Sequence, residues 1–541
     1  MRILKTLSER RPRTAIALFA ALLLLLLLAV NAPMFSNPSE FTSDDNYYIV
    51  FNQRIQSGLL TSLGRIWLSP MQFDYFPVTL TSFAVDYRLW GPNAGMFKAT
   101  NLFLFFCISL LAALLARRFS ADPDSPALPL SVMLATLVLA LHPTNVESIG
   151  LASDRKELLW VLFGLGALAW HATKGTKGKS GIVTICLVAL AQLSKGTAVV
   201  VPLLLMLHDL IRGEKPLFRK KQVLFYAILA ALSGAIFSFQ YAIAHRSGVV
   251  DILSPLVPEA RIGGVIVTVN QAILHILIPA HLSYEYDLSW PTGIAAGWQW
   301  LLPAALALLL AALLYFRKRM LLMFVLFLII PFLPSANIIP LKHVLKGHLV
   351  FYDHYLLFSC MAAVPLAAQA INAGLQSRWR PLAIAVPIAL AVVFAVYDHH
   401  LSGFWQTKER FYQRNIEMAP GLSRSYHMLG EVYYSEGRYV EARDLAERAL
   451  AKNREGRQGY KEADVIELIG DASYRAGMFE RAEAAYREYL TLKSDPEVMQ
   501  KFYFTLREEG KGREADDVKR RISGGEGTSG RAKRSSADEG R

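Results

Sequence analysis

Long apolar runs fill the first 400 residues of this 541-residue chain, and they constrain its fold more than any other feature. The first run, 14–32, has about the 19 residues that a helix needs to cross a bilayer. Backbone groups inside a bilayer must be hydrogen-bonded within the protein, so these runs are expected to be helical. Further runs follow at 97–116, 127–142, 157–171, 181–193, 197–211, 222–243, 294–315, 319–335, 349–372 and 381–399. We therefore predict an all-α membrane domain over 1–400, with about eleven spans.

Three of the apolar segments need separate interpretation. Arg2, Lys5, Arg10, Arg11 and Arg13 precede the first run, as in a signal peptide, but that run is long for a cleaved signal and is expected to be an uncleaved span. The two runs that meet at Lys195 and Gly196 are short, and one long broken helix is an alternative. The segment 261–280 contains Asn270, Gln271 and His275, so we expect a re-entrant or interfacial helix there.

Basic residues orient the predicted spans. Cytoplasmic loops carry an excess of Lys and Arg, and with the N-terminus inside, the clusters fall in cytoplasmic loops at 117–118, 174–179, 212–221, 317–319 and 378–380. The opposite side receives 33–96, 143–156, 194–196, 244–293, 336–348 and everything after residue 400. The chain is thus expected in the bacterial inner membrane with a periplasmic C-terminal domain, or in the ER membrane of a eukaryote.

Charge and cysteine usage exclude two other classes of protein. The net charge of +13 does not indicate nucleic-acid binding, because many of the cations flank predicted spans, where they orient the protein. Cys107, Cys186 and Cys360 all fall within apolar runs, which indicates small core residues rather than a disulfide framework.

A soluble helical-repeat domain is predicted over 401–522. Gly430, Gly437 and Ala442 have tetratricopeptide spacing, and the pattern recurs 40 residues later, including at Gly470 and Gly477. The usual period is about 34 residues, so a short insertion is expected near 454–460. A degenerate third unit is predicted through Phe502, Gly510 and Ala515. A generic pair of helical hairpins is the alternative, and the Gly/Ser-rich tail 523–541 is expected to be disordered.

Two adjacent carboxylates, Asp44 and Asp45, follow the first span on the outer side. Neighbouring carboxylates raise each other's pKa, which suits a general base, and they also suit a metal ion. The alternative is a structural role in which Ser43 or Asp44 caps a helix through 47–55.

Other outer residues have the chemistry to bind an anion. Arg155 and Lys156 on the 143–156 loop are candidates for a lipid phosphate, with interfacial snorkelling as the alternative. Lys195 is an ionisable residue at membrane depth, which makes it a functional candidate unless it lies at the surface. His354 could bind an anion when protonated, or could simply be hydrogen-bonded in the fold.

Seven motifs in order give the chain a family resemblance. They are Asp44-Asp45, 75–77 with 82–91, His142-Pro143 with Glu147-Ser148, 153–159, 193–195 with 202–204 and Asp209, 282–286, and 337–340. This order resembles the transmembrane and tetratricopeptide repeat-containing proteins and their bacterial relatives, which are similar to protein O-mannosyltransferases of the GT-C fold. The resemblance covers about residues 10–520. Two positions depart from the family pattern: His354 stands where an Arg is usual, and Phe76 precedes Pro77.

The resemblance implies an inverting transferase that uses a polyprenyl-phosphate-linked sugar, with an exported protein as the expected acceptor. It implies a catalytic base in the first outer loop, and we expect Asp45 in that role with Asp44 orienting it or capping the helix. The expected donor-phosphate residues are Arg155, Lys156, Lys195 and His354, and the expected substrate-binding residues are Glu147, His142 and Tyr75. The resemblance makes no cofactor certain, and a divalent metal is left open.

Two other classes of function compete with a transferase. A membrane-anchored scaffold that recruits envelope proteins would explain the repeats but not the charged outer loops. A transporter is disfavoured, because the apolar runs show no inverted repeat and few charges interrupt them.

The topology is testable with reporter fusions. An alkaline phosphatase fused after residue 405 should be active, because the basic loops place that point outside the cytoplasm. A fluorescent protein that folds only in the cytoplasm should be dark at the same point. Fluorescence there would overturn the predicted orientation.

Overall fold

The computed structural model describes residues 12–36, 39–120, 125–176, 178–213, 220–248, 258–291, 297–338, 348–456, 458 and 460–522. Within these ranges the chain is helical and contains no extended strand, which confirms the all-α prediction. The described residues do not include the basic residues Arg2, Lys5, Arg10 and Arg11 before the first span, or the tail 523–541.

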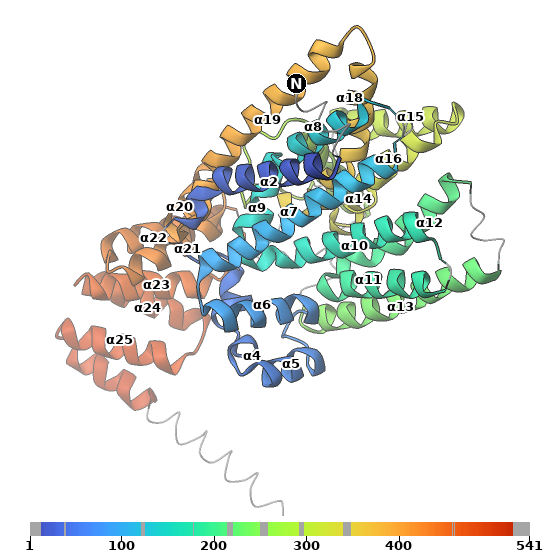
Figure 1. Cartoon of the computed structure of the whole chain (residues 1–541). Coiled ribbons are helices and arrows are strands. Elements are labelled where there is room, and N and C mark those ends of the chain that lie inside the picture. Colours follow the sequence, from blue (N-terminus) through green and yellow to red (C-terminus); the bar gives the residue numbers. More distant parts are fainter. Residues whose placement is uncertain are drawn as a thin grey trace, which may run out of the picture. The chain divides into compact units, whose positions relative to one another are not determined.

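Helices make up most of the described chain before the repeats (Figure 1). The α-helices are α2 Pro12–Val30, α3 Ala32–Phe35, α4 Gln53–Gln56, α5 Leu59–Leu68, α6 Pro77–Trp90, α7 Ala94–Arg118, α8 Leu128–Ala140, α9 Val146–Gly150, α10 Arg155–Lys174, α11 Lys179–Ser194, α12 Val201–Ile211, α13 Lys220–Arg246, α14 Pro258–Leu277, α15 Leu301–Tyr315, α16 Arg319–Ile329, α17 Leu357–Ala362, α18 Val364–Leu375, α19 Arg380–Ser402 and α20 Lys408–Met418. The shorter turns are η1 Asn46–Val50, η2 Pro143–Asn145, η3 Ala152–Asp154, η4 Gly196–Val200, η5 Gly297–Trp300, η6 Leu333–Ser335, η7 Asp353–Leu356 and η8 Gly403–Trp405.

Several of these helices have the length and composition of membrane spans. In the described part of the chain five qualify, or up to seven if each of two bent pairs is one span. Four shorter apolar helices accompany them, at Thr14–Val30, Lys179–Ser194, Gly196–Ile211 and Arg319–Ser335. The chain is therefore a multipass membrane protein, while the expected count of about eleven spans is not confirmed.

The predictions for the Lys195 break and for the segment 261–280 have different outcomes. The expected break at Lys195 is present, because α11 ends at Ser194 and Lys195 has an extended backbone before η4 begins. The expected re-entrant break in 261–280 is absent, because α14 is one unbroken helix of 20 residues, long and apolar enough to be a span. The alternative of an interfacial helix stays a prediction. Asn270 is accommodated because its amide donates to the carbonyl of Gln299, at 2.7 Å.

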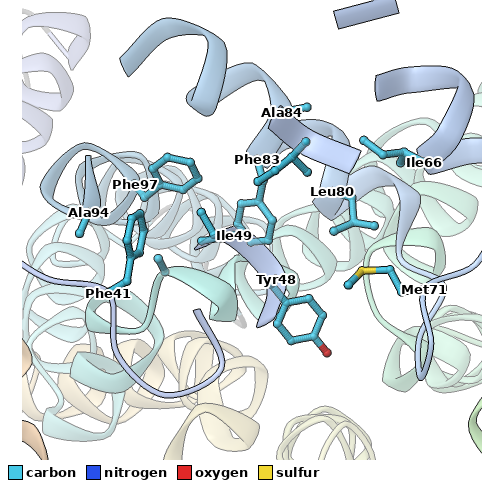
Figure 2. Packing of buried hydrophobic residues seen from close by; sticks show 12 residues of the cluster. Phe41, Tyr48, Ile49, Ile66, Met71, Leu80, Phe83, Ala84, Ala94 and Phe97 are labelled. Atoms are coloured by element: carbon cyan, nitrogen blue, oxygen red, sulfur yellow. The ribbon is translucent and has the colours of Figure 1, made fainter. Parts of the chain in front are cut away.

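The segment 41–71 folds against α6 and the start of α7 around an apolar core. Figure 2 shows Phe41 and Ile49 packed with Phe83 and Phe97, and Tyr48 beside them with its hydroxyl pointing away from the aromatic rings. Ile49, Phe83 and Phe97 are fully buried. This packing fixes the position of the residues between Phe41 and Tyr48, which include both candidate carboxylates.

The chain divides into two compact units. One consists of residues 1–343 and 349–411, and the second of residues 344–348 and 412–541. The second unit is made of helical hairpins, drawn in orange and red in Figure 1. Its helices are α21 Ser423–Ser435, α22 Tyr439–Glu455, α23 Glu462–Arg475, α24 Phe479–Leu492 and α25 Pro496–Glu508, followed by a helix over 512–522.

Glycine holds the same place in each hairpin turn. Gly437, Gly477 and Gly510 all adopt positive φ, at +81°, +75° and +76°, which L-residues with side chains rarely adopt. Gly510 thus makes the turn of the degenerate third unit. Gly470 has a different role, since a Cβ there would lie 2.5 Å from the Tyr486 ring. The repeat pattern in the sequence therefore reflects both turn geometry and close helix approach.

Candidate functional site

Four charged or phenolic side chains gather where the segment 41–74 meets the start of α10. We call Asp44, Tyr48, Asp74 and Lys156 the outer acid–base cluster, after the side on which the basic loops predict them to lie. The Tyr48 hydroxyl donates to the Asp74 carboxylate, and the Lys156 ammonium lies 4.6 Å from the centroid of the Tyr48 ring. Asp44, Asp74 and Lys156 are half-buried, so they keep some access to a ligand.

The members of this cluster act on one another electrostatically. Burial, followed by the charges of Asp74 and Asp44, holds the pKa of Tyr48 well above its ordinary value. Burial also raises the pKa of Asp74, against the opposing effects of Lys156 and the Tyr48 hydrogen bond. Burial alone would lower the pKa of Lys156, but Asp44, Asp154 and Asp74 more than offset this and raise it. Lys156 therefore stays cationic beside two carboxylates.

Asp45 is placed differently from its neighbour. It is 0% exposed, and its carboxylate accepts from the backbone N–H of Ser153 at 2.7 Å, of Thr42 at 3.1 Å and of Ala152 at 3.4 Å. These bonds tie the first loop to η3. The preference for Asp45 as the base, with Asp44 orienting it, does not fit this geometry, because an enclosed carboxylate cannot reach an acceptor hydroxyl.

The helix expected over 47–55 is divided in two. The short π-turn η1 comes first, with Asp45 at its N-cap position and no capping bond from the Asp45 side chain, and α4 begins only at Gln53. Ser43 has φ +44°, a left-handed conformation that costs on the order of 1 kcal/mol for a non-glycine residue. Its hydroxyl donates to the Tyr284 oxygen at 3.0 Å. The loop is thus held in a strained conformation immediately before Asp44.

Arg155 is part of the fold rather than of an open site. It is 0% exposed, and its guanidinium pairs with Asp86 at 2.7 Å. The same group donates to the Asn101 side chain at 2.9 Å and to the Phe97 carbonyl at 2.8 Å, and lies 4.9 Å from the Phe83 ring centroid. With its donors engaged in this way, Arg155 is not placed to hold a donor phosphate.

Lys195 is close to the cluster but already paired. It forms a salt bridge with Glu157, whose other carboxylate oxygen accepts from Trp160 Nε1 at 2.6 Å. The Lys195 ammonium also lies 4.8 Å from the ring centroid of Tyr355. It is 8% exposed, so an incoming anion would have to compete with Glu157 for it.

His354 lies between two buried carboxylates. Its Nδ1 is 2.6 Å from Glu147 Oε1 and 2.9 Å from Asp154 Oδ2. These three residues bring one ligand atom each within 4.8 Å of one another, as a metal site requires. The arrangement equally suits an imidazole that bridges two acids. Of the two alternatives left open for His354, the hydrogen-bonded one matches these contacts.

Next to His354, Asp353 extends the buried network. Its carboxylate pairs with His275 Nδ1 at 2.6 Å and accepts from the Tyr286 hydroxyl at 2.5 Å. The Asp353 backbone N–H donates to Glu147 Oε2 at 2.9 Å. Glu147, expected to bind substrate, is thus buried and positions the 353–354 backbone.

The remaining expected substrate residues, His142 and Tyr75, use their polar atoms within the fold. His142 is buried, with Nδ1 2.8 Å from the Thr144 hydroxyl and Nε2 3.1 Å from the Ile276 carbonyl. Both of its nitrogens are therefore used within the fold. Tyr75 is half-buried, and its hydroxyl donates to the Trp67 carbonyl at 2.9 Å.

The sequence interpretation missed Asp74, Tyr48 and Glu157 as members of the site. Asp74 immediately precedes Tyr75, on a segment predicted to lie outside. Its carboxylate could therefore have been included among the candidate site residues from the sequence alone. Glu157 lies one residue after Lys156, and the sequence does not indicate its role. Its salt-bridge partner, Lys195, is distant in the sequence and comes close only in the folded chain.

Comparison with known proteins supports the two-part interpretation of the chain. Residues 420–495 match the tetratricopeptide repeat family, which confirms the predicted repeats. The chain is 22% identical over 476 residues to the mouse protein O-mannosyl-transferase TMTC4, a match that covers 75% of this chain. These matches confirm the resemblance to transmembrane proteins with tetratricopeptide repeats. The chain spans only 63% of the length of that relative.

A solved structure is also similar in outline. It is ArnT from Cupriavidus metallidurans bound to undecaprenyl phosphate, with 14% identity and a TM-score of 0.43. The likeness covers 89% of this chain and 81% of that one.

The buried position of Asp45 predicts a pH-dependent stability of the first loop. Burial raises the pKa of Asp45 from 3.8 to about 6, so the folded state binds its proton more tightly than the unfolded state. Loop stability should therefore be greatest below pH 4 and fall as the pH rises to about 6. At 1.36 kcal/mol per pKa unit, the loss is about 3 kcal/mol.

Hydrogen exchange of residues 39–58 in the full chain, corrected for intrinsic rates, measures this effect. In the variant Asp45→Asn, protection should no longer depend on pH between 4 and 6. Asp287→Asn changes an exposed outer carboxylate and should leave the dependence intact. An equal slope in wild type and Asp45→Asn would contradict the assignment.

Proposed function

We propose that this chain is a membrane glycosyltransferase that moves a sugar from a polyprenyl-phosphate donor to a hydroxyl group of an exported protein. The observation that carries the proposal is the outer acid–base cluster, in which half-buried Asp44 and Asp74 lie near the cation Lys156 at the head of an apolar helical bundle. The similarity to an O-mannosyl-transferase over most of the chain supports the same class of reaction.

In this proposal, Asp44 is the general base. It is half-buried, and the hydrogen bonds of Asp45 and the packing of Phe41 and Ile49 hold the loop that carries it. A base must lie about 3 Å from the hydroxyl that it deprotonates, so a rigid loop is an advantage. Asp45 is then a positioning residue, and the roles expected for the two carboxylates are exchanged.

Lys156 is the proposed partner of the donor phosphate. The reaction breaks the bond between the anomeric carbon and a phosphate oxygen, and that oxygen leaves with the electron pair. The acceptor oxygen attacks the opposite face of the sugar as Asp44 takes its proton, which inverts the anomeric centre. A nearby cation stabilises the charge that develops on the leaving phosphate. Lys156 is half-buried and remains protonated, whereas Arg155 is fully engaged with Asp86.

Lys195 and His354 support this centre indirectly in the proposal. Lys195 influences the pKa of Asp74, so its charge acts on the cluster even while it pairs with Glu157. His354, with Glu147 and Asp154, holds the start of α10 at the correct height. The helical repeats are proposed to recognise the acceptor polypeptide, since stacked repeats form extended binding surfaces. The proposed orientation places both parts outside the cytoplasm.

The competing function is a non-catalytic scaffold that uses the repeats to recruit envelope proteins. The match to the tetratricopeptide family favours this alternative as much as it favours a transferase. The half-buried acid–base cluster distinguishes the two, because a scaffold has no need for carboxylates and a cation at the same partly exposed point.

Replacement of the proposed base tests the transferase. Asp44→Asn should lower the rate of sugar transfer by about a hundred- to ten-thousand-fold, because the amide keeps the shape but cannot accept the proton. The measurement is transfer from membranes loaded with radiolabelled polyprenyl-phosphate sugar to envelope protein. Asp287→Asn is the matched control and should remain active. A scaffold would show no transfer in wild type, and full activity of Asp44→Asn would remove this residue from catalysis.

Charge reversal at Lys156 tests the donor site separately. Lys156→Glu should weaken donor binding by about ten- to a hundred-fold, since a charge-assisted contact contributes about 1.5–3 kcal/mol. The KM for the lipid donor should rise while the KM for the acceptor stays the same. Equal changes in both constants would contradict the assignment.

A further inference from the structure

A second group of ionisable side chains lies far from the outer acid–base cluster. His171 is in the last turn of α10, and His208 and Asp209 are in the last turn of α12. We call these three residues the histidine cluster. Lys156 is at the opposite end of α10, and 15 residues of helix separate it from His171 by about 22 Å. Asp209 belongs to one of the seven motifs of the family resemblance, but it has no role in the proposed reaction.

Both imidazoles point at one carboxylate oxygen. His171 Nε2 lies 2.8 Å from Asp209 Oδ1, and His208 Nδ1 lies 3.1 Å from the same atom. The three ligand atoms lie within 4.8 Å of one another, and all three residues are buried. Ligands of a tetrahedral zinc ion are about 3.3 Å apart, from bond lengths of about 2.0–2.2 Å. An ion could therefore enter if the cluster opened by a few tenths of an ångström.

Neighbouring side chains hold this arrangement. The His171 ring stacks on Phe225, with centroids 5.9 Å apart, and the His208 ring packs on Phe119 at 5.4 Å. The Tyr226 hydroxyl donates to Asp209 Oδ2 at 2.8 Å. This bond fixes the carboxylate so that Oδ1 faces the two rings. A partner that orients a ligating carboxylate is a usual feature of metal sites.

The ring nitrogens that point away from Asp209, His171 Nδ1 and His208 Nε2, do not fix the tautomers of the two imidazoles. His171 Nδ1 and His208 Nε2 are buried and have no hydrogen-bond partner among the described residues. Each proton can therefore move to the far nitrogen without breaking a hydrogen bond there. That shift leaves His171 Nε2 and His208 Nδ1 with lone pairs directed at the same point, which is the state that binds a metal.

The charge of the cluster also favours a cation. Asp209 is buried near the end of the apolar helix α12. In the described part of the chain, its ion pairs are with His171 and His208. With both rings neutral, the cluster carries one negative charge in apolar surroundings, which is costly. A divalent ion would neutralise the carboxylate and bind both imidazoles at once.

We propose that the histidine cluster is a metal site that takes one divalent transition ion of the zinc class. Two imidazole nitrogens and one carboxylate oxygen are a donor set that zinc binds readily. The ion would join the ends of α10 and α12, with Tyr226 bringing in α13. Because the site is at the end of α10 away from Lys156, its role is to fix the bundle rather than to take part in sugar transfer.

Metal analysis of the purified chain tests the proposal. The full-length protein, without a polyhistidine tag, is equilibrated with excess zinc sulfate, dialysed, and measured by mass spectrometry of the metal. Wild type should retain about one zinc per chain. The double variant His171→Gln with His208→Gln should retain a tenth of that or less. His245→Gln replaces an exposed histidine on α13 and should bind as wild type does.

A milder variant covers the case in which the double variant does not fold. Tyr226→Phe keeps all three ligands and removes only the hydrogen bond to Asp209, so zinc affinity should fall by about ten- to a hundred-fold. Zinc should also raise the thermal unfolding temperature of wild type at concentrations that have less effect on Tyr226→Phe. Wild type that retains no zinc, or retention unchanged in the double variant, would overturn the proposal.

Discussion

A charge buried among apolar helices must have a partner, and the ion pair of Arg155 with Asp86 shows how strongly this requirement shapes the molecule. Leaving either group alone in these surroundings would be strongly destabilising. The guanidinium also bonds Asn101 and the Phe97 carbonyl, so one side chain connects α6, α7 and α10. The start of α10 is thereby fixed, and with it Lys156, the next residue along the chain.

The same requirement separates side chains that look equivalent in the sequence. Asp44 and Asp45 are adjacent carboxylates, yet Asp45 is enclosed by backbone N–H groups and Asp44 is half-buried beside a cation. Arg155 and Lys156 are adjacent cations, and again the first is committed to the fold while the second remains within reach of a ligand. In each pair, the enclosed residue positions the other.

Hydropathy and repeat spacing predict most of the fold, because both are local patterns. The break at Lys195, the glycine turns at 437 and 477 and the apolar helices are all visible in the order of residues. Asn270, Gln271 and His275 predicted a re-entrant or interfacial segment, but α14 is unbroken. The Asn270 amide donates to the carbonyl of Gln299, a partner 29 residues away in the sequence. The site was predicted less well for the same reason. Burial of Glu147 and His354, and the contribution of Asp74, depend on contacts between segments distant in sequence.

The two ends of α10 show why ionisable groups collect where they do. Glu157 lies in its first turn and His171 in its last, which matches the partial charges of a helix at its N- and C-termini. The middle of the helix, by contrast, has no backbone charge to offer, and buried leucine and alanine fill it. The ionisable side chains of α10 therefore lie toward its two ends. In this chain one end of α10 meets the carboxylates of the first loop, and His171 at the other end meets His208 and Asp209 of the α12 terminus. The same helix geometry thus places the proposed acid–base centre and the proposed metal site at opposite ends of one rigid element.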